Sequence, residues 1–225
     1  MTAPHRLILF DVDGTLVDSQ AAIVQAMHAA FDAIRHPVPE RPVLLSVIGL
    51  SLDRAMQHLT PDLGSSDHAR MAEVYKTTFS ANRTELGAAH APLYPGARNM
   101  LDQLAGMSGH VLGVATGKSQ RGLDALIEAH GLGDHFITRQ VADHHPSKPH
   151  PSMIQTAMDE TGADPRDTVM IGDTSFDMEM ARAAGVTGIG VSWGYHSAEA
   201  LGVDHVLSTF DDLPEVLQAV WERSA

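Results

Sequence analysis

The feature of this sequence that most constrains its fold is a series of short apolar segments separated by helical patterns. The apolar segments are residues 7–10, 111–115, 136–138, 168–171 and 188–191. Helical patterns are centred on residues 97–104, 121–129, 152–161 and 176–184. Short apolar runs of this kind are typical of strands that are buried on both faces. Strands that alternate with helices predict an α/β protein with a doubly wound parallel sheet, whose functional residues follow the carboxyl ends of the strands.

A long segment after the first predicted strand has a different character. Residues 17–91 contain no convincing strand, but residues 22–34 carry an amphipathic helical stripe, and Met71, Tyr75 and Phe79 indicate another. We therefore expect an all-helical cap domain at 17–91, inserted above the carboxyl edge of the sheet, and a core domain formed by 1–16 and 92–225. Such a cap is a lid over the site.

Composition excludes several classes of function. The 225 residues include no cysteine, which rules out thiol catalysis and cysteine-ligated metal centres. Fifteen Lys and Arg against 28 Asp and Glu give a net charge of −13, which argues against nucleic acid polymers and anionic membranes as partners. No apolar stretch approaches the length of a membrane span, and no targeting signal is evident, so we expect a cytoplasmic protein.

The strongest chemical motif is Asp11-Val12-Asp13-Gly14-Thr15, directly after the first apolar segment. Two carboxylates two residues apart project to the same side of an extended chain. A turn capped by an Asp side chain is the alternative interpretation, but the position behind a buried strand favours a functional pair. Gly14 permits a sharp turn, and Thr15 is expected to hydrogen-bond back across it.

Polar residues also follow the later strands. Thr116 and Gly117 suit an anion site in front of a helix, although a helix cap would look the same. Lys148 stands between two prolines, which favours a positioned ammonium group over a solvated one. Asp173 ends another strand, and Asp177, four residues later, also fits a capping box with Thr174.

The order of these motifs resembles that of the haloacid dehalogenase superfamily over nearly the whole chain. Asp11 to Thr15, the strand-end Thr116, the isolated Lys148 and the Gly-Asp-x-x-x-Asp run at 172–177 carry the resemblance. Residues 93–96 and 49–52 are similar to the phosphoglycolate phosphatase-like branch. The resemblance implies a Rossmann-like core with a helical cap.

The resemblance also implies a role for each matching residue. Asp11 would be the nucleophile that forms an aspartyl-phosphate, and Asp13 would protonate the leaving oxygen and then activate water. Thr116, the Gly117 amide and Lys148 would hold the phosphoryl group. Mg²⁺ would be bound by a set of oxygen ligands: Asp11, the backbone carbonyl of Asp13, and Asp173, with Asp177 behind them. An all-oxygen site suits a hard cation, Mg²⁺ or Mn²⁺.

We therefore expect a phosphatase of small phosphorylated metabolites, with phosphoglycolate as the leading substrate. Asp13 favours phosphate esters over haloacids, whereas Gly117 stands where phosphoglycolate phosphatases often carry Asn. A phosphomutase, a nucleotidase or pyrophosphatase, and a non-catalytic phosphometabolite sensor remain alternatives. The sequence leaves open whether the protein is a monomer or a homodimer.

Other conspicuous residues receive structural interpretations. His144, His145 and His150 are expected in a surface loop rather than in a metal site, with a contact to substrate left open. Arg54 and His58, one turn apart in the cap, are expected on a solvated helix face. The Gly-Ile-Gly run at 188–190 is read as a closely packed strand, and the methionines at 153, 158, 170, 178 and 180 as core residues.

Overall fold

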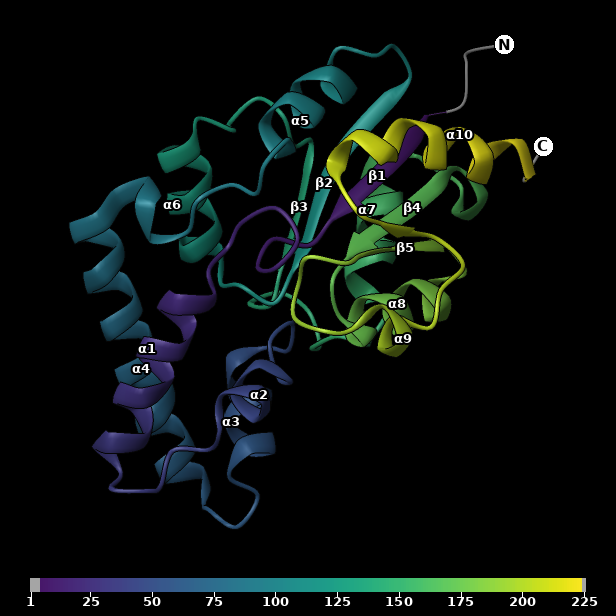
Figure 1. Cartoon of the computed structure of the whole chain (residues 1–225). Helices are drawn as coiled ribbons and strands as arrows, with labels where there is room; N and C mark the ends of the chain where they lie inside the picture. The colour runs from purple at the N-terminus through teal and green to yellow at the C-terminus, as the bar shows by residue number, and fades with distance from the viewer. Residues whose placement is uncertain (1–4, 224–225) are drawn as a thin grey trace.

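The computed structural model describes residues 5–223, and within them six parallel strands form one sheet (Figure 1). The strands are β1 (Arg6–Phe10), β2 (His110–Thr116), β3 (Thr138–Val141), β4 (Thr168–Gly172), β5 (Thr187–Val191) and β6 (Val206–Leu207). Their spatial order is β3-β2-β1-β4-β5-β6. This order confirms the doubly wound, Rossmann-like core and places the topological switch point between β1 and β4.

Helices cover both faces of the sheet, which explains why its inner strands, such as β1 and β4, are largely apolar. On one face lie α5 (Ala97–Ala105), α6 (Gln120–His130) and α10 (Leu213–Arg223), and on the other α7 (Ser152–Thr161) and α8 (Ser175–Ala184). Along β1, Ile8 and Phe10 pack into the first layer, whereas Leu7 and Leu9 pack into the second. Short elements complete the core: η2 (Pro165–Asp167), α9 (Ala198–Leu201) and η3 (Phe210–Asp212).

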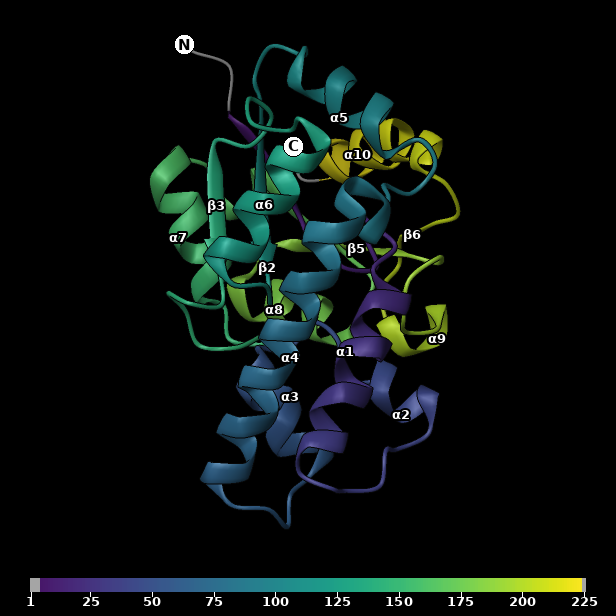
Figure 2. The ribbon, with the colours of Figure 1, turned by 90° about the vertical axis from the view of Figure 1, so that its left-hand side faces the viewer.

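A group of helices extends beyond one end of the sheet and has a hydrophobic core of its own (Figures 1 and 2). These helices are α1 (Gln20–Ala33), α2 (Arg41–Leu45), α3 (Leu52–Leu59) and α4 (Ser65–Leu86), followed by η1 (Gly87–His90). Phe31, Met56 and Met71 are fully buried between them. The expected helical cap is therefore present. In the described part of the chain no helix, α4 included, is both long and apolar enough to cross a membrane.

The two connections between the cap helices and the sheet lie side by side. Val17 pairs with Leu93 in an isolated antiparallel bridge. The Asp18 amide donates to the Pro92 carbonyl at 2.8 Å, and the Tyr94 amide donates to the Leu16 carbonyl at 2.9 Å. Hydrogen bonds on both sides of the bridge tie the outgoing chain to the returning one.

The structure corrects one predicted strand and adds elements that the sequence did not reveal. The strand predicted at 136–138 begins only at Thr138, and Ile137 is 72 % exposed. β3 is an edge strand that contains Gln140, whose side-chain amide donates to Thr138 Oγ1 and Glu160 Oε2. Because these polar partners replace apolar burial, the strand does not look apolar in sequence. The two-residue β6 and helix α10 were not anticipated.

Candidate active site

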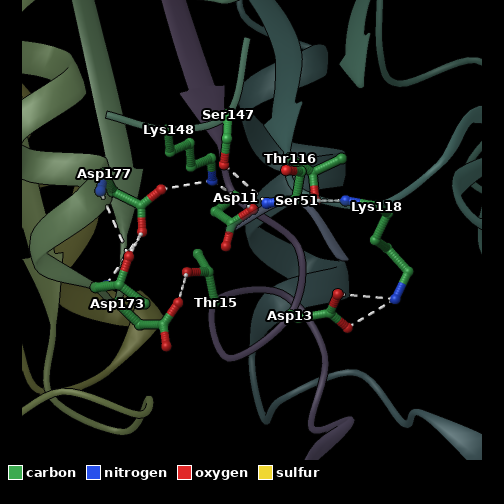
Figure 3. A network of polar contacts seen from close by, with 11 residues as sticks. Asp11, Asp13, Thr15, Ser51, Thr116, Lys118, Ser147, Lys148, Asp173 and Asp177 are labelled. Atoms are coloured by element: carbon green, nitrogen blue, oxygen red, sulfur yellow. Dashed lines mark hydrogen bonds and ion pairs between the residues drawn. The ribbon is translucent and has the colours of Figure 1, made fainter. Parts of the chain in front are cut away.

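Three buried carboxylates from different elements meet at the carboxyl edge of the sheet (Figure 3). Asp11 follows β1, Asp173 follows β4, and Asp177 lies in the first turn of α8. Their nearest carboxylate oxygens lie within 4.8 Å of one another. The switch point between β1 and β4 thus brings together three of the predicted acidic residues.

Asp173 is held on both carboxylate oxygens. Thr15 Oγ1 donates to Oδ1 at 3.0 Å, and the Tyr195 amide donates to Oδ2 at 2.9 Å. The expectation that the Thr15 hydroxyl bonds back across its own turn is therefore wrong, because the hydroxyl reaches across the switch point to Asp173. Gly14 and Gly194 leave the space that this carboxylate needs, since a Cβ at either position would lie within 2.2 Å of an Asp173 side-chain atom.

Asp177 belongs to the N-terminal capping box of α8 and also contacts a residue of the site. Its Oδ2 accepts hydrogen bonds from the Thr174 amide at 3.1 Å and from Thr174 Oγ1 at 2.7 Å, so the predicted capping box is present. Its Oδ1 accepts from Lys148 Nζ at 2.6 Å. Both oxygens are thereby occupied by protein donors.

Lys148 lies between two carboxylates and is 2 % exposed. Besides its bond to Asp177, Nζ forms an ion pair with Asp11 Oδ1 at 2.8 Å. Burial by itself would lower the pKa of Lys148, but the charges of Asp11 and Asp177 outweigh it and raise the pKa. This lysine is a fixed ammonium ion in the site, not a solvated surface group.

The electrostatics of the cluster favour a bound cation. Burial raises the pKa of Asp11 to about 6, with Lys148 opposing the shift and Asp177 adding to it. Burial, together with the charges of Asp11 and Asp177, raises the pKa of Asp173 well above its usual value. Lys148 pairs with Asp11 and Asp177 but not with Asp173, and the carboxylate oxygens are hard ligands of the kind that Mg²⁺ accepts. The residues present therefore fit a divalent cation.

Asp13 lies apart from this cluster and has different partners (Figure 3). Lys118 Nζ lies 2.8 Å from both of its carboxylate oxygens, and Ser19 Oγ donates to Oδ1 at 2.5 Å. Ser19 Oγ is also 3.0 Å from the Tyr195 hydroxyl oxygen. The sequence interpretation assigned no role to Lys118, Ser19 or Tyr195. The sequence clue that could have identified these three residues is that each lies shortly after the end of a strand or after a motif.

Thr116 is the last residue of β2, Gly117 follows it, and both line the same cavity as Asp11. Thr116 is buried, and its Oγ1 accepts a hydrogen bond from the Lys118 amide at 3.3 Å. A Cβ on Gly117 would lie 2.7 Å from the carbonyl oxygens of Gly49 and Leu50. The close approach of this cap loop therefore explains why glycine, and not a larger residue, occupies position 117.

A cavity of about 270 Å³ separates the core from the cap. Asp11, Asp13 and Thr116 line it from the core. From the cap, one face of α4 lines the cavity: Tyr75, Lys76, Phe79, Ser80 and Arg83. The sequence interpretation included Tyr75 and Phe79 in an amphipathic stripe and did not single out the other three. Phe79 lies under Lys118, with Nζ 5.0 Å from the ring centroid, a cation–π contact between cap and core.

The remaining singled-out residues lie outside this cavity. Arg54, His58 and His150 line a second cleft, between α3 and the loop that carries Lys148, and Arg54 and His58 are exposed, as predicted. His145 is held by Gln140 and Ser152, with both ring nitrogens 2.8 Å from their side-chain oxygens, and His144 is exposed. None of the three loop histidines lines the cavity that contains Asp11.

Two further sequence interpretations are confirmed. The Gly-Ile-Gly run lies in β5, where a Cβ on Gly190 would lie 2.6 Å from a Leu201 side-chain atom. Four of the five methionines are buried, and Met158 packs against the same core.

Comparison with known proteins places these features in a family. The family model of the haloacid dehalogenase-like hydrolases matches residues 8–191. A protein of Dickeya dadantii named probable phosphatase IndB is 37 % identical over 95 % of this chain and 92 % of its own length. A phosphoglycolate phosphatase of Vibrio parahaemolyticus is 26 % identical over 96 % of each chain.

Solved structures show the same fold. A hydrolase from Pseudomonas syringae superposes with a TM-score of 0.84 at 24 % identity, covering 95 % of this chain and 98 % of the other. The chain belongs to the haloacid dehalogenase-like hydrolase family.

Proposed function

We propose that this protein is a Mg²⁺-dependent phosphatase that hydrolyses small phosphomonoesters through an aspartyl-phosphate on Asp11. The observation that carries the proposal is the surroundings of Asp11. Its carboxylate lines the cavity, pairs with the buried ammonium of Lys148 at 2.8 Å, and lies beside two further carboxylates. Phosphoryl transfer requires this combination of a positioned nucleophile and charge neutralisation.

The proposed reaction has two steps. A carboxylate oxygen of Asp11 attacks phosphorus while the bond to the ester oxygen breaks, and Asp13 gives its proton to that leaving oxygen. Asp13, now a carboxylate, then takes a proton from water as the water attacks phosphorus, the bond to Asp11 breaks, and phosphate leaves. Lys118, 2.8 Å from both Asp13 oxygens, stabilises the carboxylate that the first step leaves behind.

Three groups would hold the phosphoryl oxygens between these steps. We assign this role to Thr116 Oγ1, the Gly117 amide and Lys148 Nζ. Thr116 and Gly117 line the same cavity as Asp11, and Lys148 Nζ lies 2.8 Å from Asp11 Oδ1.

For the metal we assign Asp11, Asp173 and the backbone carbonyl of Asp13 as ligands. Asp177 lies behind them, because Lys148 and Thr174 already occupy its oxygens. A bound Mg²⁺ would neutralise negative charge on the phosphoryl oxygens. Asp177 acts instead through Lys148, which it holds against Asp11.

Phosphoglycolate is the leading candidate substrate. The cavity of about 270 Å³ is at the small end of ligand pockets and suits a short ester. Relatives aligned over nearly the whole chain are named phosphatase and phosphoglycolate phosphatase. We propose in addition that residues 17–91 act as the cap and residues 1–16 and 92–225 as the core, with the paired connections at Val17 and Leu93 between them.

Hydrolysis of p-nitrophenyl phosphate tests the nucleophile. We expect turnover with Mg²⁺, none after removal of the metal with EDTA, and a loss of at least about 1,000-fold for Asp11→Asn, because an amide cannot form the phosphoenzyme. Asp159→Asn, the same change on an exposed residue of α7, should leave the rate unchanged. Unaltered hydrolysis by a folded Asp11→Asn protein would rule the mechanism out.

A panel of phosphorylated metabolites, assayed by phosphate release, tests the substrate. We expect the highest kcat/KM for phosphoglycolate. A flat profile would contradict that choice, and an isomerised sugar phosphate in place of free phosphate would identify a phosphomutase.

A further inference from the structure

One face of α4 brings basic and aromatic side chains to the cavity that contains Asp11. Tyr75, Lys76, Phe79, Ser80 and Arg83 recur at the spacing of a single helix face and all line the cavity. None of them takes part in the reaction steps proposed above. The face is therefore free to contact a part of a bound ester other than the reacting phosphate.

Two guanidinium groups, one from the cap and one from the core, converge on this face. Arg83 donates to Ser80 Oγ at 3.4 Å, and Arg121 at the start of α6 donates to the same oxygen at 3.0 Å. Figure 2 shows α6 beside the end of α4 that lies nearest the core. The hydroxyl of Ser80 is thus a meeting point for two positive charges.

Within the described residues, these charges lack an acidic partner. Among residues 5–223, none of the salt bridges involves Lys76, Arg83 or Arg121. The carboxylates of Asp53 and Asp143 line the same cavity, but neither pairs with them, and Asp143 accepts from the Gln120 amide instead.

Burial and the positive charges around this face both affect the pKa of a nearby histidine, His90. Burial lowers the pKa of His90, and the charges of Lys118 and Arg83 lower it further. In a chain with a net charge of −13, three unpaired cations around one cavity indicate an anionic ligand group.

We propose that Arg83, Arg121 and Lys76 form a subsite for a second anionic group of the substrate, so that the enzyme prefers short phosphomonoesters that carry another acid group. This inference rests on the proposed phosphatase function. A guanidinium group can form paired hydrogen bonds with a carboxylate or with a phosphate. Because Arg83 and Arg121 both reach the Ser80 hydroxyl, the two guanidinium groups can bind a single acid group. Because Arg83 belongs to the cap and Arg121 to the core, a bound acid group also links the two.

A matched pair of substrates tests the subsite. Phosphoglycolate and 2-hydroxyethyl phosphate have the same reacting phosphate and nearly the same length, but only the first carries a carboxylate. We expect the wild-type protein to have at least a tenfold higher kcat/KM for phosphoglycolate. Ethylene glycol bisphosphate is the third substrate, and its second acid group is a phosphate. If its kcat/KM exceeds that of phosphoglycolate, the subsite prefers a phosphate, and if it is lower, the subsite prefers a carboxylate.

Arg83→Met and Arg121→Met should each remove most of this preference. Losing one charged hydrogen-bond donor should lower kcat/KM for the preferred acid ester by about 10- to 100-fold, chiefly through KM, and for 2-hydroxyethyl phosphate by less than about twofold. Arg70→Met is the control, because Arg70 is an exposed arginine of the same helix that does not line the cavity. It should behave like the wild type with every ester.

The outcomes separate this inference from the proposed function. If both esters are hydrolysed equally well, or if the arginine variants lose both alike, the enzyme is a phosphatase but the subsite is wrong. If neither these esters nor p-nitrophenyl phosphate is hydrolysed, the proposed function fails. Calorimetric titration of Asp11→Asn protein with the same esters and Mg²⁺ then decides the subsite without turnover: tighter binding of the acid ester that Arg83→Met abolishes supports it, and equal binding overturns it.

Discussion

At the scale of single residues, the site depends on glycines as much as on carboxylates. Gly14 has a φ of +85°, a conformation that side chains disfavour, and Gly172 lies so close to Asp177 that a Cβ would come within 2.4 Å of its carboxylate carbon. At Gly14, Gly172 and Gly194 the backbone therefore packs directly against the side chains of Asp173 and Asp177. This close packing matters because each oxygen of a buried carboxylate must reach a hydrogen-bond donor.

Gly14→Ala tests this dependence. A Cβ there would lie 2.2 Å from Asp173 Oδ2, so the substitution should displace that carboxylate and weaken Mg²⁺ binding by about 10- to 100-fold. Gly131→Ala is the matched control, because Gly131 also has a positive φ, of 59°, but open space around it. Both variants should lose about 1–2 kcal/mol of stability from backbone strain. Mg²⁺ titrations followed by thermal unfolding measure both effects, and equal metal affinity in the two variants would contradict the role of Gly14.

At the scale of elements, α8 combines a capping motif with the site. The Thr174–Asp177 box satisfies the first turn of the helix, and the same Asp177 holds Lys148 against Asp11. The local motif was readable in the sequence because a capping box spans only four residues. Its link to Lys148, 29 residues away, was not.

Thr174→Ala should therefore affect more than the helix. Loss of a cap costs about 1 kcal/mol, and loss of the 2.7 Å bond to Asp177 Oδ2 should also lower kcat on p-nitrophenyl phosphate by about tenfold, because Asp177 then positions Lys148 less well. Thr209→Ala removes the corresponding threonine of the capping box at η3, far from these residues in the chain. Chemical denaturation should show a similar cost for both, whereas activity should fall only for Thr174→Ala. A parallel loss of activity in both would mean that the effect is one of stability alone.

At the scale of the whole molecule, the acidic composition and the binding of an anion are compatible. Part of the charge of −13 is the buried cluster of Asp11, Asp173 and Asp177, which fits a cation. Lys148 and the unpaired cations of α4 and α6 supply positive charge beside the cavity. The negative net charge of the chain therefore does not prevent the cavity from attracting an anion.

The raised carboxylate pKa values predict how metal binding depends on pH. The pKa of Asp11 is about 6 in the folded protein without metal, against 3.8 for an ordinary Asp, so below pH 6 the carboxyl group must release a proton before it binds Mg²⁺. Affinity should fall about tenfold per pH unit for each proton released, and the raised pKa of Asp173 steepens the fall. The increase in Tm on addition of Mg²⁺ should be larger at pH 8 than at pH 5. An equal increase at the two values would show that the cluster does not bind the ion.

The raised pKa of Asp11 also predicts how the stability of the metal-free protein changes with pH. A carboxyl group whose folded pKa is raised stabilises the fold below its unfolded pKa, and this stabilisation is lost as pH rises from about 4 to 6. Relative to the wild type, metal-free Asp11→Asn should therefore gain stability over that pH interval.

The sequence alone determined the class of fold, because buried parallel strands need apolar runs, and most helices show a regular spacing. It also predicted that Asp11, Asp173 and Asp177 gather at one edge of the sheet, because a parallel sheet collects such groups at the carboxyl ends of its strands. Polar edge strands such as β3 escaped detection because hydrogen bonds, not apolar burial, hold Gln140 in place. Only the tertiary structure brought Lys118 to Asp13, Thr15 to Asp173, and Arg83 to Arg121. These pairs are far apart in the chain, and no local pattern records which distant side chain a charge or a hydroxyl will meet.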